Sequence, residues 1–189
     1  MKHLLFALTL ALGATVATSA HASDRDLSLT YADVVYQDID GVADGFGVRG
    51  SYGFGESNWF IHGDFNRLDI SGVSGSNFKL WHAGVGYALP AADSVDVVLD
   101  GTYQSLRFDG NTLDGYRLGA GLRAVLGTPR LEGHAKAYYY TGGDLQSQWA
   151  ANVGLNFFFT HTKRFSLLGE YEFADSGDDI FWVGLRATF

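Results

Sequence analysis

The chain closes on Phe181-Trp-Val-Gly-Leu-Arg-Ala-Thr-Phe189, and these nine residues decide the fold. Apolar residues alternate there with small or polar ones, and Trp182 is the single exception. A period of two with one apolar face predicts a β-strand with one oily side. An oily strand that ends on an aromatic residue suits a barrel in lipid, where a strand edge cannot stay unpaired. The alternating apolar positions are Phe181, Val183, Leu185, Ala187 and Phe189.

This terminal Phe189 with its alternating apolar positions resembles the sorting and assembly signal of bacterial outer-membrane barrels. The resemblance implies insertion by the barrel assembly machinery, which we expect to be a partner of the chain. It also implies that the protein lies in the bacterial outer membrane. There we expect a monomer in contact with outer-membrane lipid and lipopolysaccharide.

The other end of the chain is typical of a secretory signal peptide. A short basic start, Met1-Lys2-His3, precedes a continuous apolar run and then a stretch of small residues. Ala20-His21-Ala22 has the A-x-A form of a cleavage site, and the apolar run is too short and wrongly flanked for a spanning helix. We therefore expect Ala20 and Ala22 to direct cleavage, with a signal peptide over 1–22 and one barrel domain over 23–189.

The composition excludes several classes of protein. The chain has 189 residues and a net charge of −8 with no basic tract, which argues against binding to nucleic acid. It has no Cys, so neither a disulfide framework nor a thiolate metal site is expected. No segment after residue 22 approaches 18 consecutive apolar residues, so we expect no spanning helix.

Alternation along the rest of the chain predicts ten strands. Their length suits a membrane, because spanning strands need about 9–11 residues whereas strands of soluble proteins average about 5–6. Aromatic residues gather near both strand ends, as in the two girdles of a lipid-embedded barrel. We expect an all-β protein, a single antiparallel up-and-down transmembrane β-barrel of ten strands, with eight as the alternative. The expected strands are 26–37, 44–54, 58–69, 78–89, 94–107, 114–127, 130–141, 146–159, 164–174 and 179–189.

For the first strand, the sequence does not settle which face meets lipid. Asp33 falls in phase with Leu27, Leu29 and Tyr31, so a charge interrupts an apolar face. Either the phase slips at a bulge, or this face is not the one that meets lipid.

Many charged residues fall on the inward phase of the strands. Unpaired buried charge is very costly, so each needs a partner on a neighbouring strand. Because a barrel of about eight strands is just filled by its side chains, we expect a lumen closed by ion pairs. The expected neighbours are Arg186 with Glu170 and Glu172, and Arg123 with Asp100 and Glu132. The full expected network is Arg49, Asp64, Asp100, Arg117, Arg123, Glu132, Lys136, Glu170, Glu172 and Arg186.

No constellation for catalysis or metal binding stands out. We find no nucleophile with an apposed base, and we expect no enzyme, cofactor or resident metal. With periplasmic termini, the outward loops are short and rich in Asp. The Asp-Gly pairs at 40–41, 44–45, 109–110 and 114–115 are expected to form turns.

Three further stretches carry a resemblance to a family: Asp44-Gly-Phe-Gly-Val-Arg-Gly-Ser-Tyr52, Trp81-His-Ala-Gly-Val-Gly-Tyr87 and Asp114-Gly-Tyr-Arg-Leu-Gly-Ala-Gly-Leu-Arg123. They resemble small outer-membrane β-barrel proteins, the broad group that includes the membrane domain of outer membrane protein A. The resemblance implies the barrel and provides no catalytic residues. We expect a structural or cell-surface interaction role; the alternatives are a narrow solute or ion pore and, third, a lipid-modifying enzyme.

Overall fold

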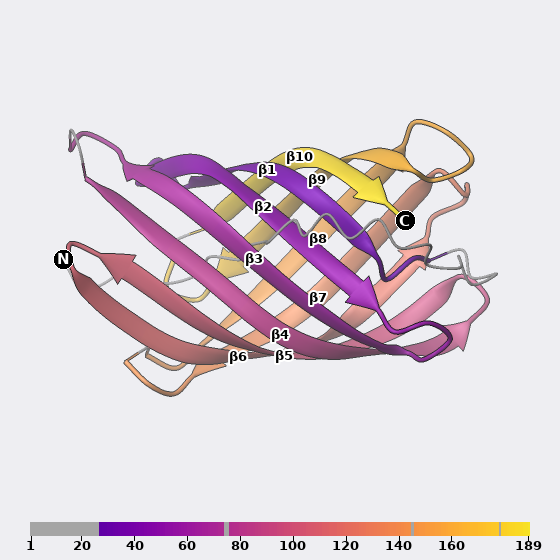
Figure 1. The fold of residues 1–189 in the computed structure, drawn as a ribbon, viewed down its shortest axis with the longest axis horizontal. Helices are drawn as coiled ribbons and strands as arrows, with labels where there is room; N and C mark the ends of the chain where they lie inside the picture. Colours follow the sequence, from indigo (N-terminus) through magenta and orange to yellow (C-terminus); the bar gives the residue numbers. More distant parts are fainter. Residues whose placement is uncertain (1–26, 74–75, 145, 178) are drawn as a thin grey trace.

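The computed structural model describes residues 27–73, 76–144, 146–177 and 179–189. The expected signal peptide, with Ala20 and Ala22, lies outside these ranges. Within them, no helix has the length and apolar character needed to cross a membrane. Ten strands follow one another along the chain (Figure 1). They are β1 (Tyr31–Ile39), β2 (Ala43–Gly53), β3 (Trp59–Ile70), β4 (Asn77–Ala92), β5 (Val95–Phe108), β6 (Asn111–Val125), β7 (Leu131–Thr141), β8 (Gln148–Phe158), β9 (Phe165–Ala174) and β10 (Ile180–Thr188).

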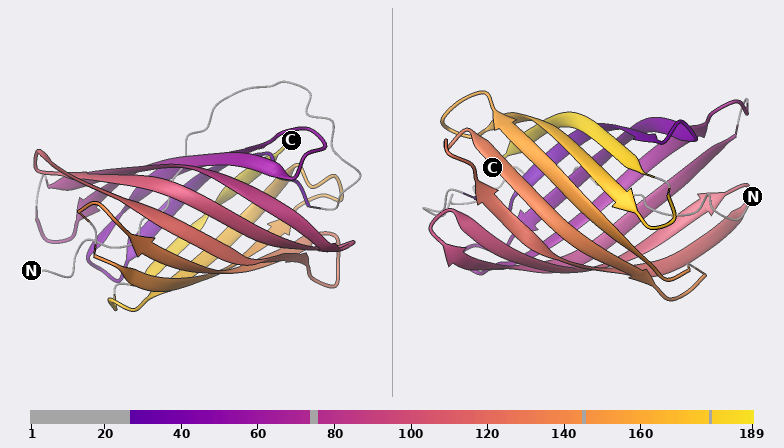
Figure 2. Two further views of the ribbon diagram at one scale, coloured as in Figure 1. Left: turned by 90° about the horizontal axis from the view of Figure 1, so that it is seen from below. Right: turned by 180° about the vertical axis from the view of Figure 1, so that it is seen from behind.

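The strands form one closed antiparallel barrel. Each pairs with its neighbours in sequence, and β1 pairs with β10 from Tyr31 opposite Thr188 to Ile39 opposite Ile180. Figures 1 and 2 show the strands inclined to the long axis of the barrel on every side. Closure leaves no strand edge unpaired, as lipid requires. The prediction of ten strands in an up-and-down barrel is confirmed, and the eight-stranded alternative is wrong.

The two faces of the wall differ sharply in polarity. β8 shows this best, because its residues alternate between buried and exposed along its whole length. The exposed positions are mostly large and apolar: Trp149 is 60% exposed and Leu155 52%. Comparable side chains surround the barrel, including Leu118, Phe165 and Leu185. Such a continuous apolar surface far exceeds what a soluble monomer exposes, so the exterior belongs in lipid.

The first strand has its charged face inside. Asp33 is 2% exposed, whereas the next residue, Val34, is 58% exposed. β1 stays in register with both neighbours, and Asp33 lies opposite Arg49 on β2 and Arg186 on β10. Of the two alternatives for this strand, the bulge is therefore wrong: the face that carries Asp33 lines the lumen, because its partners lie there.

The Asp-Gly pairs divide into two kinds. Asp40-Gly41 and Asp109-Gly110 form turns, and all four residues have positive φ, as tight hairpins require. The pairs at 44–45 and 114–115 do not form turns; they lie inside β2 and β6. At Gly45 a side chain would press on the backbone of β3, with a Cβ only 2.9 Å from Leu68 Cα. This glycine permits close strand contact rather than a turn.

Candidate functional site in the barrel lumen

We call the end of the barrel that holds Tyr31 and Thr188 the terminal end, and the opposite end, where β1 and β2 are joined, the distal end. An apolar layer fills the distal part of the lumen. Leu68, Tyr140, Ile180 and Trp182 are completely buried there. They pack in one cluster with Val35, Ile39, Ala43, Phe78, Leu80, Leu106, Tyr138, Ala150 and Leu168. This apolar layer was not expected, because the sequence analysis considered only charges on the inward phase.

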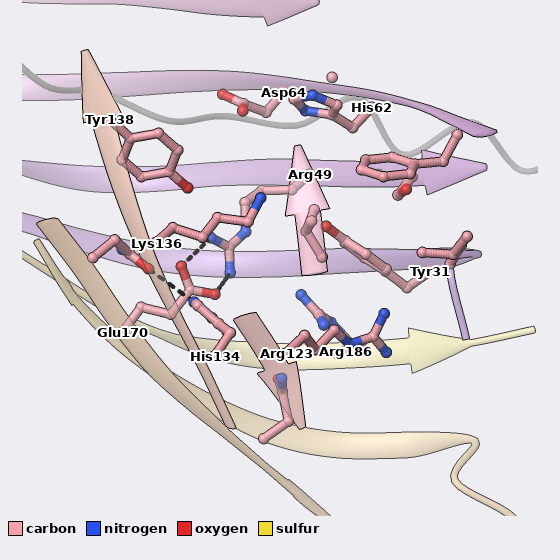
Figure 3. Close-up of a pocket in the computed structure, with 18 of the residues that line it drawn as sticks. Tyr31, Arg49, His62, Asp64, Arg123, His134, Lys136, Tyr138, Glu170 and Arg186 are labelled. Carbon is pink, nitrogen blue, oxygen red and sulfur yellow. Dashed lines mark hydrogen bonds and ion pairs between the residues drawn. The ribbon is translucent and has the colours of Figure 1, made fainter. Parts of the chain in front are cut away.

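A polar cavity of about 120 Å³ lies deeper in the lumen, toward the terminal end. Its wall is contributed by strands from all round the barrel, and Figure 3 shows their side chains converging on it. Many of the lining residues are charged, and His62 and His134 lie beside them; the charged ones are Arg49, Asp64, Arg117, Arg123, Lys136, Glu170 and Arg186. The volume holds only a few water molecules.

A chain of four residues of alternating charge runs along one side of this cavity. Both terminal nitrogens of Arg49 donate to the Glu170 carboxylate at 2.7 Å, a bidentate pair visible in Figure 3. Arg49 Nε also donates to Asp33 at 3.1 Å. Arg186 completes the chain, with Nε and Nη2 each 2.8 Å from an oxygen of Asp33. All four residues are at most 8% exposed, so the chain ties β9, β2, β1 and β10 together.

This arrangement corrects the expected partner of Arg186. It bonds Asp33, not Glu170 or Glu172, because the register places Asp33 directly opposite it on β1 and Ser166 opposite it on β9. Asp33 was absent from the expected network because the phase of its strand was left open. The need of Arg49 and Arg186 for a carboxylate was the signal that would have identified it.

A second group of ion pairs lies on the other side of the cavity. Arg123 Nη2 donates to Glu132 at 3.1 Å, and Lys163 Nζ donates to the other oxygen of Glu132, also at 3.1 Å. Glu132 was one of the two neighbours expected for Arg123. The other, Asp100, bonds Lys136 instead, at 2.5 Å. Lys163 was not expected here, because it follows a turn and belongs to no strand.

Three further charged residues of the network contact aromatic or imidazole side chains. Glu172 accepts a hydrogen bond from the Tyr140 hydroxyl at 2.8 Å, which joins the polar region to the apolar layer. The Arg117 guanidinium lies 4.4 Å from the centre of the Tyr138 ring. Asp64 lies 3.1 Å from His82 Nδ1. The structure thus places all ten residues of the expected network inside the barrel.

The lumen offers little for chemistry on a substrate. Asp64 and His82 have the proximity of an acid and the base it orients, but they are 2% and 1% exposed. Among the described residues, no group of three or more His, Cys, Asp or Glu side chains is arranged to hold a metal ion. The arrangement is suited to joining strands by charge.

The expected assembly signal lies on the outer face of β10. Phe181, Leu185 and Phe189 are 44%, 59% and 56% exposed, and Val183 and Ala187 share their face. The Phe189 amide donates to Thr30 O at 3.1 Å, which fixes the terminus beside the start of β1.

No family model and no curated protein matches the chain. Solved structures do match its fold. A KdgM porin superposes with a TM-score of 0.53 at 12% identity over 84% of this chain and 99% of the porin. A KdgM porin in complex with disordered oligogalacturonate gives 0.51 at 16% identity, over 84% and 99% of the two chains. The β domain of the Bordetella autotransporter BrkA gives 0.54 at 14% identity, over 85% and 98%.

The chain has the fold of a bacterial outer-membrane β-barrel. The expected resemblance to small barrels of this kind is thereby confirmed for the fold, and the apolar exterior suits a barrel that is embedded in lipid. At these identities the likeness extends to the fold and no further.

Proposed function

We propose that this barrel is closed and that its role is structural or at the cell surface, rather than the passage of solutes. The observation that carries the proposal is the presence of two fillings in series along the lumen. An apolar layer occupies the distal part and an ion-paired layer the part toward the termini. A solute would have to displace both.

The energetics of the two layers favour permanent closure. Trp182 and Tyr140 are among the largest fully buried side chains, and neither ring is accessible to solvent in the distal layer. The bidentate contact of Arg49 on β2 with Glu170 on β9 holds two strands that are not neighbours in one geometry. Separating this buried pair would take its guanidinium partner from Glu170 and leave Arg49 with Asp33 alone.

The connections at the distal end are short, which limits what the protein can bind at the cell surface. The strands are joined there by residues 40–42, 71–76, 109–110, 142–147 and 175–179. Binding and catalytic residues of a rigid scaffold are usually carried by longer loops. The surfaces that remain for interaction are the distal rim and the lipid-facing exterior.

A narrow pore is the second candidate. The cavity of about 120 Å³ supports it, because five cationic side chains line it: Arg49, Arg117, Arg123, Lys136 and Arg186. A KdgM porin of similar fold is described in complex with an oligogalacturonate, an acidic sugar. On this alternative the present chain would admit small acidic solutes after its distal layer moved.

Solute flux into vesicles separates the two candidates. Refolded protein in liposomes should leave the entry rates of a neutral sugar, a small carboxylate and a small cation equal to those of protein-free vesicles. Entry that is faster for the carboxylate than for the sugar would support the pore and contradict closure. Heat-modifiable mobility on a gel confirms that the protein in the vesicles is folded.

A further inference from the structure

Three cationic side chains form a row across the outside of the barrel near its distal end. Arg67 on β3 lies opposite Lys79 on β4, and Lys79 lies opposite Arg107 on β5. All three are exposed, and each alternates with buried neighbours such as Leu68 and Leu106, so all three point away from the lumen. We call this row the basic arc. Across three strands it spans about 10 Å.

Aromatic residues fix the depth of the basic arc in the membrane. Phe65 precedes Arg67 by two residues on the same face, and Trp81 follows Lys79 by two. Trp81 packs against Tyr103 with ring centres 5.2 Å apart, on the side of the arc nearer the terminal end. Aromatic girdles mark the boundary of the hydrocarbon, and two residues of strand advance about 6–7 Å. The arc therefore lies at the depth of the polar headgroups.

In the part of the protein that the structure describes, the basic arc forms no ion pair, although the exposed Asp69 follows Arg67 by two residues on the same face. Like charges directly opposite one another destabilise a sheet. Within the described parts of the chain, Arg67, Lys79 and Arg107 form no ion pair or side-chain hydrogen bond. Cations of the lumen such as Arg49 and Arg186, by contrast, are held by carboxylates. Because Asp69 is bonded to none of the three cations, an anion of the surrounding membrane is a candidate for their counter-charge.

We propose that the basic arc binds the phosphate groups of a phosphorylated lipid in the outer leaflet. Both termini of bacterial barrels face the periplasm, so the distal end lies in the outer leaflet. Two Arg forks match phosphate oxygens in bidentate fashion, and the Lys between them adds a mobile point charge. A row about 10 Å wide exceeds one phosphate and suits a headgroup that carries two. The proposal goes beyond the closed lumen and does not depend on it.

Binding of lipid A to the folded barrel in detergent tests the proposal. Native mass spectrometry would give an apparent Kd for lipid A, for the same lipid with its phosphates removed, and for inorganic phosphate. Replacing one cation with Gln should weaken lipid A binding about fivefold, and replacing all three roughly a hundredfold. The control is Arg164→Gln, which removes an exposed cation at the terminal end and should leave the Kd unchanged.

Three results would overturn the proposal. The triple variant would bind lipid A within twofold of the wild type, the dephosphorylated lipid would bind as tightly as lipid A, or inorganic phosphate alone would bind as tightly as the lipid. If the triple variant does not fold, the proposal is tested with the single Gln variants and with the two single variants Arg67→Lys and Arg107→Lys. The Lys variants keep the charge but lose the fork, so they should weaken binding less than the Gln variants.

Discussion

At the residue scale, Asp33 is the carboxylate that two arginines of the lumen share. One carboxylate bonds two arginines, Arg49 and Arg186, and both pairs are buried. A buried charge in such a network contributes mainly by compensating its partners, because the desolvation of each ion offsets much of the attraction. Removing the shared carboxylate should therefore be more harmful than its own bonds suggest, since two cations lose a partner at once.

Asp33→Asn should lower the free energy of unfolding by about 3–5 kcal/mol, the range for breaking a buried pair from one side. The shape of the side chain is kept, so the loss reports on charge. Urea titration in lipid vesicles measures it. Asp38→Asn, on the outer face of the same strand, should change stability by about 0.5 kcal/mol or less. Equal midpoints for the two variants would mean that Asp33 has no such role.

At the element scale, the strands could be predicted from the sequence, but the pairing of charged side chains between strands could be predicted only in part. The period of two placed nine strands within three residues of their observed bounds, because one face of each must be apolar in lipid, while the first strand begins five residues later than predicted. Pairing depends on register between strands, which alternation within one strand does not specify. Hence Arg186 was matched to Glu170, although the register aligns it with Asp33. The apolar layer around Trp182 was missed for a related reason, since an inward aromatic residue breaks the pattern used to find the outward face.

The same strand pattern predicts how a charge is tolerated on the lipid side. Leu122 is 51% exposed on the outer face of β6, about midway between Tyr116 and Leu126. Leu122→Arg should cost about 2–4 kcal/mol in vesicles, whereas Leu126→Arg, near the interface, should cost about 0–1 kcal/mol. Leu122→Ala controls for lost apolar area. If both Arg variants unfold at the same urea concentration, the assigned depth of β6 is wrong.

We predict that the terminal residue of the chain matters more for assembly than for stability. Phe189 is exposed; its backbone amide donates to Thr30 O, and its carbonyl oxygen accepts a hydrogen bond from the Ser28 hydroxyl. Deleting Phe189 should reduce the folded, heat-modifiable fraction in the outer membrane of cells but only slightly lower the stability of protein refolded in vitro. Phe159→Ala is the matched control, since Phe159 is an exposed aromatic residue near the same end but not the terminus. Unchanged levels of folded protein after the deletion would contradict an assembly role.

At the scale of the whole molecule, the wall and the lumen have opposite characters. The exterior is apolar and continuous, so it suits lipid. The interior holds an apolar distal layer, an ion-paired layer and, toward the terminal end, a small apolar cluster of Phe60, Ala88 and Val98. A barrel of ten strands leaves little width beyond its own side chains. This arrangement is better suited to a rigid barrel with a structural role than to a pathway for solutes.

Single-channel recording in planar bilayers tests the closed lumen most directly. The protein would be refolded, its folded state verified by heat-modifiable mobility, and its insertion confirmed by protection from added protease. We predict no steady current at any holding potential, because Trp182, Tyr140 and the Arg49–Glu170 pair block the lumen in series. Stable, ion-selective openings of uniform size from the wild-type protein would contradict closure and establish the pore.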